Sequence, residues 1–199
     1  MSAFRKLKSL WGLTLIKYAY RKNIELGGKI NVSGIPVLFF KKDGRLILGN
    51  NVSLKSNKRS YHLHMHSPVK IMADRPGAVI EIGDNTRING SCIHAYKKIS
   101  IGKNCLIAAN CQIFDGSGHD LSFPDVANRI NTIGDAKPII IEDNVWIGAN
   151  CIILPGVRIG QGSVISAGSV VHKDIPEMCV AAGNPVKVVK HYSVNPPTA

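Results

Sequence analysis

The chain has 199 residues, 45% of them hydrophobic, and a formal net charge of +12. This length is enough for one sizeable domain with its own packed core, whereas two full domains would be crowded. The longest apolar run near the start, LWGLTLI at residues 10–16, is far too short to cross a bilayer, and no small-residue cleavage site follows it. We therefore expect a cytoplasmic globular protein.

The positive charge is concentrated at the start of the chain. Residues 1–70 contain 14 lysines and arginines against two acidic residues, whereas residues 71–199 contain 11 of each sign. Such an asymmetry favours an anionic partner for the first third of the chain, such as a membrane surface or an acidic glycan. We expect no nucleic-acid partner, because no recognised nucleic-acid motif accompanies the charge.

Residues 1–26 form the first predicted unit, a basic amphipathic helix. Within residues 3–22 the apolar positions recur at helical spacing. These positions are Leu7, Leu10, Trp11, Thr14, Leu15 and Tyr18. The helix could cap the open end of a β coil, which exposes unpaired edges, or it could lie as a peripheral element on the inner face of an anionic membrane. The sequence leaves both roles open.

Residues 27–80 are expected to form less regular coils. LGNNVS and LKSNKR are weak six-residue repeats, whereas YHLHMHSP breaks their phase. His62, His64 and His66 would share one face of a strand and could bind a metal there. No cysteine or acidic residue accompanies them, so we expect ordinary surface histidines and no metal site.

Residues 81–190 carry the signal that decides the fold, a six-residue repeat. From Ile141 the chain divides into IEDNVW, IGANCI, ILPGVR, IGQGSV, ISAGSV and VHKDIP, and the same phase occurs from Ile101 and from Ile82. Each hexad fits one side of a triangular coil, with its first aliphatic residue inward and Gly, Asn or Asp in tight turns that require positive φ. Stacked coils bury a continuous aliphatic column. The predicted fold is therefore an all-β parallel β-helix, followed by a tail at residues 191–199.

The fifth position of each hexad is expected at a narrow corner, where only small or β-branched side chains fit. Cys92, Cys105, Cys111 and Cys151 occupy this position. An odd total of five cysteines without CxxC spacing argues against both a disulfide framework and a zinc knuckle. We therefore interpret these four cysteines as small buried hydrophobic residues.

An extended loop, residues 119–138, interrupts the repeat. A loop of this length on a regular solenoid is usually functional. IFDGSG is the last regular hexad, with Ser117 at its narrow corner, and His119 is the first residue of the loop. A neutral imidazole whose other nitrogen is held by a carboxylate is the usual general base near neutral pH. Asp115 and Asp120 both flank this histidine, and the sequence does not decide between them.

The chain from IGKNCLIAAN through GSGHD, AKPIIIEDNVWIGANCIILPGVRIG and AGSVVHKDIPEMCVAAGNPVKVV resembles the hexapeptide-repeat acyltransferases. It is similar to the galactoside and maltose O-acetyltransferases and, with its basic N-terminal extension, to the bacterial polysaccharide O-acetyltransferases. This resemblance implies a left-handed β-helix, acetyl-CoA as co-substrate without a metal, and a homotrimer with active sites between neighbouring subunits. It also implies that His119 removes the proton from an acceptor hydroxyl, which attacks the thioester directly. Asn89 in INGSC matches an asparagine that orients the acceptor and stabilises charge near the carbonyl.

The same resemblance implies a CoA path along small residues of the later hexads. The matching positions are Trp146, Gly148, Ala149, Ala167, Gly168, Gly183, Asn184 and Pro185, and Lys187 and Lys190 could meet the CoA phosphates. Small side chains suit this role, because a slender pantetheine arm lies flat only where backbone groups are reachable. Trp146 is at a sixth, outward-facing hexad position, which favours a ligand or subunit contact.

The acceptor is the part of the reaction that the sequence specifies least. The family commonly has proline after this histidine, whereas Asp120 follows here, and HAYKK at residues 94–98 replaces acidic residues of the family. We predict transfer to a hydroxyl of a glycan or glycan precursor, such as capsule, O-antigen or exopolysaccharide. The alternatives are an antibiotic or serine acceptor, a zinc enzyme of the γ-carbonic-anhydrase type, and a non-catalytic solenoid. The zinc enzyme needs three histidines at a subunit interface, and the loop base supplies only His119.

Overall fold

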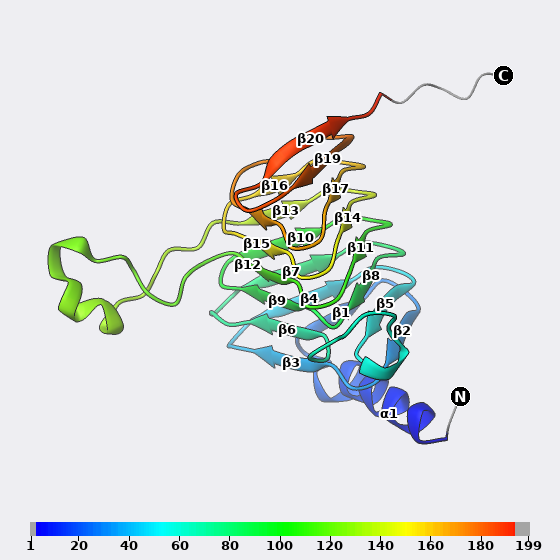
Figure 1. Cartoon of the computed structure of the whole chain (residues 1–199). Coiled ribbons are helices and arrows are strands. Elements are labelled where there is room, and N and C mark those ends of the chain that lie inside the picture. The colour runs from blue at the N-terminus through cyan, green and yellow to red at the C-terminus, as the bar shows by residue number, and fades with distance from the viewer. Residues whose placement is uncertain (1–2, 194–199) are drawn as a thin grey trace.

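The computed structural model describes residues 3–193, which form a triangular column of parallel strands with a helix at one end (Figure 1). From β1 to β18 the strands alternate among three sheets, so every third strand along the chain pairs in parallel. Such an order requires the chain to turn a corner after each strand and to complete one coil every three strands. The predicted all-β parallel β-helix is confirmed.

The three sheets are named A, B and C here. Sheet A consists of β1 (Ile24–Leu26), β4 (Arg45–Leu48), β7 (Val79–Ile82), β10 (Lys98–Ile101), β13 (Ile139–Ile141) and β16 (Arg158–Ile159). Sheet B consists of β2 (Ile30–Ser33), β5 (Val52–Lys55), β8 (Arg87–Asn89), β11 (Leu106–Ile107), β14 (Trp146–Ile147), β17 (Val164–Ile165), β19 (Cys179–Ala182) and β20 (Lys187–His191). Sheet C consists of β3 (Val37–Phe40), β6 (Lys70–Ala73), β9 (Cys92–Ala95), β12 (Gln112–Phe114), β15 (Ile152–Ile153) and β18 (Val170–Val171). The last strand, β20, runs antiparallel to β19.

The core is a set of aliphatic ladders that run along the column axis. In sheet B the register stacks Leu54, Ile88, Ile107, Ile147 and Ile165, each with 0% exposure. Burying one such side chain stabilises the fold by about 1.5–3 kcal/mol. All five ladder residues are the first residues of their hexads, so the predicted inward placement of that position is confirmed.

A ladder of asparagines marks the corner between sheets A and B. Asn51, Asn85, Asn104 and Asn144 all have φ between 56° and 61°. Each Nδ2 in this series donates to the Oδ1 of the next asparagine, at 3.0, 3.1 and 3.2 Å. Asparagine tolerates this left-handed conformation better than most residues. The predicted positive-φ turns of the hexads are therefore confirmed.

Three of the four predicted corner cysteines are buried. These are Cys105, Cys111 and Cys151. The prediction is wrong for Cys92, which is half-buried on β9, while Ser91 fills the corner with 0% exposure. The cause is a shorter coil side, because the inward residue after Ile88 is Ile93 and not residue 94. Partial burial still raises the pKa of the Cys92 thiol.

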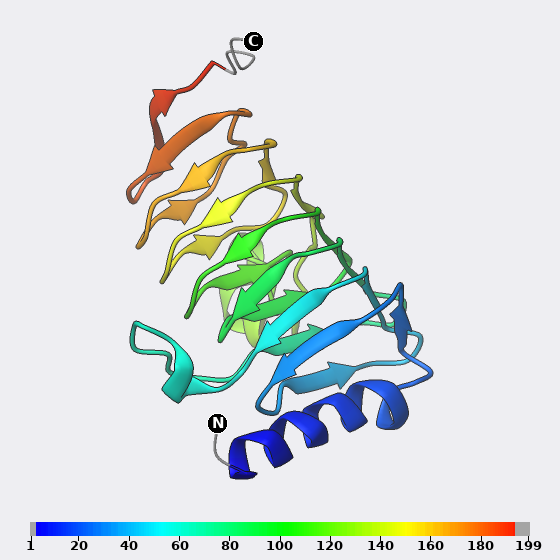
Figure 2. The ribbon, with the colours of Figure 1, turned by 90° about the vertical axis from the view of Figure 1, so that its right-hand side faces the viewer.

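The predicted N-terminal helix is present and crosses the open end of the column (Figure 2). It comprises α1 (Ala3–Thr14) and the π-helical turn η1 (Leu15–Ala19). Ile16 inserts into the core with 1% exposure. Gly12 packs so closely that a Cβ there would lie 2.3 Å from the carbonyl oxygen of Gly34. The helix therefore caps the column, and no helix within residues 3–193 is long and apolar enough to cross a membrane.

Two excursions leave the column at its corners. The first runs from β5 to β6 and contains the short 3-10 helix η2 (Lys58–Ser60). The second runs from β12 to β13 and contains η3 (Phe123–Asn131). Figure 1 shows that the second excursion projects far from the column. It contains the extended loop predicted at residues 119–138, which we call the arm.

Candidate functional site

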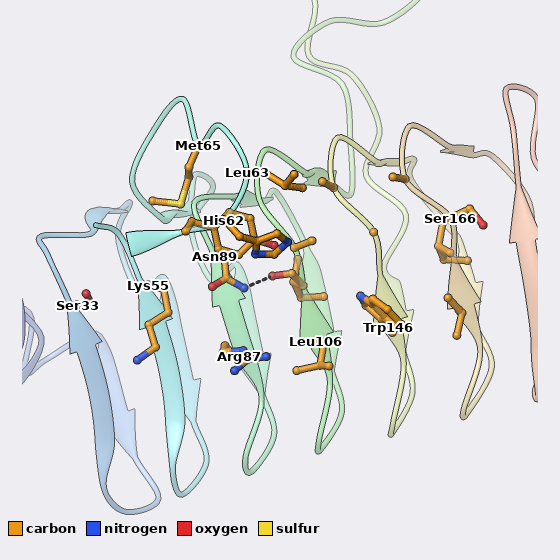
Figure 3. A pocket seen from close by; sticks show the side chains of 18 of the residues that line it. Ser33, Lys55, His62, Leu63, Met65, Arg87, Asn89, Leu106, Trp146 and Ser166 are labelled. Atoms are coloured by element: carbon orange, nitrogen blue, oxygen red, sulfur yellow. Dashed lines mark hydrogen bonds between the residues drawn. The ribbon is translucent and has the colours of Figure 1, made fainter. Parts of the chain in front are cut away.

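A groove of about 860 Å³ lies on the outer face of sheet B, under the first excursion (Figure 3). Residues of β8, β11, β14 and β17 form its floor, and Tyr61, His62, Leu63 and Met65 form its roof. Small-molecule sites in proteins commonly enclose about 300–1,000 Å³. The groove is therefore large enough to hold a cofactor arm together with part of a second substrate.

Five of the predicted site residues line this groove. They are Asn89, Trp146, Gly148, Ala149 and Ala167. Glycine is required at position 148, because a Cβ there would lie 2.5 Å from the backbone nitrogen of Ala167. Trp146 is 53% exposed and stacks in register between Leu106 and Val164, which gives the groove an apolar strip. A flat floor beside an apolar strip suits an extended, mostly apolar chain such as pantetheine.

Asn89 lies at the end of β8 and is 8% exposed. Its Nδ2 donates to the carbonyl oxygen of Ile107 at 2.9 Å, which holds the amide in one orientation (Figure 3). Among the described residues, none donates a hydrogen bond to its Oδ1. This oxygen is therefore available to accept a hydrogen bond from a substrate hydroxyl.

The remaining predicted CoA residues lie beyond the groove, towards the C-terminal end of the column. Gly168 follows β17 with φ of 75°, and a Cβ there would meet no atom within 4 Å. Gly183, Asn184 and Pro185 lie in the turn between β19 and β20, and Lys187 and Lys190 lie on β20. Since β19 and β20 continue sheet B after β17, a ligand extending from the groove along this sheet would pass towards them.

His119 is not part of the groove on its own chain. It is exposed at the root of the arm, and Figure 1 shows the arm leaving the column on the side away from β11, β14 and β17. Its backbone N–H donates to the Ser117 hydroxyl, but no described residue forms a hydrogen bond with its ring. A base for the groove would therefore have to come from another chain.

Arg75 closes the root of the arm. Its Nη2 donates to the carbonyl oxygen of Gly134 at 2.7 Å and to that of Ser117 at 3.2 Å, which ties the returning segment to the outgoing one. The guanidinium also lies 4.2 Å from the centre of the Tyr96 ring. These contacts fix the start of the arm, where His119 stands, relative to the column.

The prediction that Ser117 fills a narrow corner is wrong, because Ser117 is exposed and Asp115 is fully buried instead. The Asp115 carboxylate accepts hydrogen bonds from the three successive backbone N–H groups of residues 96–98, at 2.6, 2.8 and 2.7 Å. Both of its oxygens are thus in use, so Asp115 anchors the corner and does not orient His119. Asp120 accepts a backbone hydrogen bond within the arm.

Sequence reasoning missed the roof of the groove. YHLHMHSP forms a loop, so its three histidines do not share one face of a strand. His62 lines the groove, whereas the backbone at His64 and His66 is held by the Asn110 side chain at 2.7 and 2.9 Å. Within the described part of the chain, no three His, Cys, Asp or Glu residues cluster as metal ligands would. The break in hexad phase was the one available signal for this excursion.

Two comparisons by sequence identify similar proteins. The family model described as "Hexapeptide repeat of succinyl-transferase" matches residues 79–115 and 138–173, the two parts of the column on either side of the arm. A protein of Saccharomyces cerevisiae, named "Putative acetyltransferase YJL218W", is 48% identical over 115 residues, which is 57% of either chain. The alignment thus spans little more than half the length of that relative.

Two solved structures share the fold over almost the whole chain. A maltose O-acetyltransferase from Clostridium difficile 630 aligns with a TM-score of 0.60 and 27% identity, covering 96% of this chain and 90% of that one. The hexapeptide-repeat acetyltransferase VCA0836 from Vibrio cholerae, complexed with acetyl coenzyme A, aligns with a TM-score of 0.56 and 25% identity, covering 96% and 88%. The left-handed form of the predicted β-helix is thereby confirmed, and a relative with this fold binds acetyl-CoA.

Proposed function

From the match to the hexapeptide-repeat family model and the fold shared with hexapeptide-repeat acetyltransferases, we propose that this chain is an acetyl-CoA-dependent O-acetyltransferase. One observation carries the proposal. The groove has a floor suited to pantetheine, and the amide oxygen of Asn89 is suited to an acceptor hydroxyl. Among the described residues that line the groove, the ring of His62 in the roof is the only histidine or carboxylate beside Asn89 and Trp146. The predicted base, His119, stands instead on an arm that points away from this groove.

The arm has the surface of a segment that packs against another molecule. Five large apolar side chains on it are between 57% and 77% exposed. They are Leu121, Phe123, Val126, Ile130 and Ile133. Exposed apolar clusters of this kind mark interaction sites. We therefore place the arm against a neighbouring copy of the chain, with His119 facing the neighbour's groove.

The three faces of the column support a ring of three subunits. Sheet A carries ion pairs on its outer face, such as Glu81 with Lys98 at 3.0 Å, as expected of a solvated surface. Sheets B and C have no such pair between a cation and a glutamate of neighbouring strands among the described residues. Apolar side chains are exposed on all three faces, such as Ile140 on sheet A, Trp146 on sheet B and Phe39 on sheet C. A triangular column with one ion-paired face and two faces without such pairs fits a closed cyclic assembly. The proposed homotrimer has one site in each of its three grooves.

In the proposed reaction, His119 takes the proton of the acceptor hydroxyl as that oxygen attacks the thioester carbonyl of acetyl-CoA. Asn89 Oδ1 accepts a hydrogen bond from a neighbouring hydroxyl of the acceptor and so orients it, which leaves the proton of the attacking hydroxyl to His119. The tetrahedral intermediate collapses with cleavage of the carbon–sulfur bond, and the CoA sulfur leaves with the proton that the imidazolium returns. Proton transfer by a positioned base of this kind contributes about 10²–10⁴-fold to the rate.

The proposed acceptor is a hydroxyl of a glycan or glycan precursor, such as capsule, O-antigen or exopolysaccharide. Similarity to a maltose O-acetyltransferase supports a sugar hydroxyl. The experiment is thiol release from acetyl-CoA in the presence of a panel of sugars, with serine and an aminoglycoside as the competing acceptors. Acceptor-dependent release with a sugar is the expected result. Thiol release with none of the panel would overturn the proposed acetyltransferase. Stoichiometric zinc in protein prepared without chelator would favour a zinc enzyme of the γ-carbonic-anhydrase type instead.

A further inference from the structure

The N-terminal helix has two different faces, and one of them packs on the column. The inner face consists of Ser9, Gly12, Leu13, Ile16 and Tyr20, which are buried or half-buried. These positions recur every three or four residues and so lie on one side of the helix. The Ser9 hydroxyl accepts a hydrogen bond from the backbone N–H of Gly34 at 3.2 Å. This inner face therefore caps the column.

The outer face carries a separate apolar stripe. Leu7, Leu10, Trp11 and Tyr18 are 53%, 60%, 58% and 69% exposed. By helical spacing they lie on the side opposite to Gly12 and Ile16. Four large apolar side chains turned to solvent on one side of a short helix mark an interaction surface. This apolar stripe is therefore left uncovered in a single chain.

Basic side chains flank the outer stripe. By helical spacing Lys6 and Lys17 lie along one edge and Lys8 lies along the other, and all three are exposed. This end of the molecule is strongly cationic, since residues 1–70 contain 14 basic and two acidic residues. An apolar stripe between cations is the composition of helices that lie in the interface of anionic membranes.

The stripe also points in a direction that suits a flat surface. The helix lies across the end of the column, so its outer face is directed along the column axis and away from the strands (Figure 2). Sheets B and C, which we assign to contacts between subunits, form the sides of the column. Three columns packed side by side, as in the proposed trimer, would present three such stripes in one plane. Several weak contacts to one surface raise the overall affinity.

We propose that this stripe binds the surface of a membrane containing anionic lipid. Leu10 and Trp11 enter the interface, and the flanking lysines lie among the headgroups. The protein would then work as a peripheral enzyme at the inner face of the membrane.

The test is co-sedimentation of the full-length protein with vesicles of phosphatidylglycerol and phosphatidylcholine. We expect binding that weakens with added salt and that falls at least about tenfold in a Leu10→Ser/Trp11→Ser variant. Both side chains are exposed, so the fold should persist. The matched control is Val189→Ser/Tyr192→Ser, which removes side chains of 62% and 48% exposure from the opposite end of the column and should bind as the unaltered protein does.

Equal binding of the two double variants, or no binding of the unaltered protein, would overturn the membrane proposal. A lower oligomeric state of Leu10→Ser/Trp11→Ser in analytical ultracentrifugation would assign the stripe to a contact between copies and would also overturn it. Thiol release by Leu10→Ser/Trp11→Ser in solution tests the proposed transferase separately. The variant should release thiol even if the membrane proposal fails.

At the end of the groove beside β5 and β8, two cations lack acidic partners among the described residues. Lys55 and Arg87 line the groove, and their side chains point out from neighbouring strands β5 and β8 (Figure 3). No carboxylate of the described residues lies within 4 Å of either one. On sheet A, by contrast, the outward cations Arg45, Lys98 and Arg158 each pair with a glutamate.

Both cations lie beside the residue that is predicted to orient the acceptor. Lys55 pairs with Asn89 across β5 and β8, and Arg87 precedes Asn89 by two residues, about 7 Å along the strand. Two unpaired cations in a groove favour a ligand with a negative charge. We infer that the acceptor carries a carboxylate or phosphate group, which Lys55 and Arg87 bind. This inference rests on the proposed function and narrows its substrate class.

The test compares methyl glucuronide and glucose 1-phosphate with methyl glucoside as acceptors. We expect kcat/KM to be at least about tenfold higher for an anionic sugar and to lose that advantage in Lys55→Gln/Arg87→Gln, with the neutral sugar unaffected. Arg45→Gln, which removes an exposed cation from sheet A, is the matched control. Equal use of all three sugars would overturn the inference and leave the transferase in place. Weaker CoA binding by the variant at unchanged acceptor KM would assign these cations to the CoA phosphates and overturn it too.

Discussion

We expect His119→Ala to lower kcat by about 10² to 10⁴-fold while acetyl-CoA binds as before. The imidazole is exposed at the root of the arm and contributes nothing to the core, so its removal should leave the fold intact. It lies outside the groove of its own chain, and in the neighbour's groove it is proposed to meet the acceptor hydroxyl, so the contacts proposed for CoA at Trp146 and Ala167 persist. The loss should therefore appear in the turnover number, measured as thiol release with both substrates saturating.

His172→Ala is the matched control for this prediction. His172 is exposed on the column and belongs to a regular hexad, so its removal should leave turnover unchanged. An unchanged turnover in His119→Ala would contradict direct base catalysis by this residue. Together with unchanged CoA binding, that result would point to another base, for which His62 in the roof of the groove is the nearest candidate.

The largest loss of stability is expected from Asp115→Ala. The carboxylate is fully buried and accepts hydrogen bonds from the three backbone N–H groups of residues 96–98. Alanine leaves these donors without an acceptor inside a closed corner. A buried donor without a partner costs about 1–3 kcal/mol, so the free energy of unfolding should fall by about 3 kcal/mol or more. The measurement is the shift of the urea midpoint at unchanged slope and fixed chain concentration.

Two further variants calibrate this loss. Asp125→Ala removes an exposed acid from the arm and should change the free energy of unfolding by no more than about 0.5 kcal/mol. The free energy of unfolding of Asp115→Asn should lie between those of Asp115→Ala and Asp125→Ala. The amide retains one acceptor oxygen but turns an NH₂ group towards backbone donors. Equal stability of Asp115→Ala and Asp125→Ala would contradict the anchoring role of the buried carboxylate.

Much of the column could be predicted because the six-residue period follows directly from the geometry of one coil side. The prediction failed where the side length changes. One residue fewer between inward positions moves Cys92 out of the corner, and continued strand alternation carries Asp115 inward where Ser117 was expected. Cys92 lies shortly after Asn89, and Asp115 lies shortly before the arm with His119. The six-residue spacing is therefore least informative beside the segments that build the site.

The N-terminal helix illustrates a second limit of sequence patterns. Its most apolar stripe contains Leu10 and Trp11, yet the face that packs on the column contains Ser9 and Gly12. Close approach of a helix to a turn requires small side chains, which a search for apolar spacing does not favour. Helical spacing therefore predicted the element correctly and could not decide which side would be buried.

The candidate site could be predicted residue by residue but not as an assembly. Asn89 and Trp146 follow from hexad position and resemblance, and the structure brings them into one groove. The roof over them depends on contacts between distant segments, such as Asn110 with the backbone of His64. The placement of His119 depends on a second chain, which no pattern within one sequence specifies.

Complementation between subunits tests most directly whether the site is shared. His119→Ala lacks the base, and Ala167→Trp fills the groove, so each variant alone should be inactive. An intact site needs the arm of an Ala167→Trp chain and the groove of a His119→Ala chain. In trimers assembled at random from equal amounts of the two chains, this occurs at about one interface in four. Co-expressed chains should thus recover about a quarter of the unaltered thiol release. Activity no higher than that of either variant alone would contradict a site built from two chains.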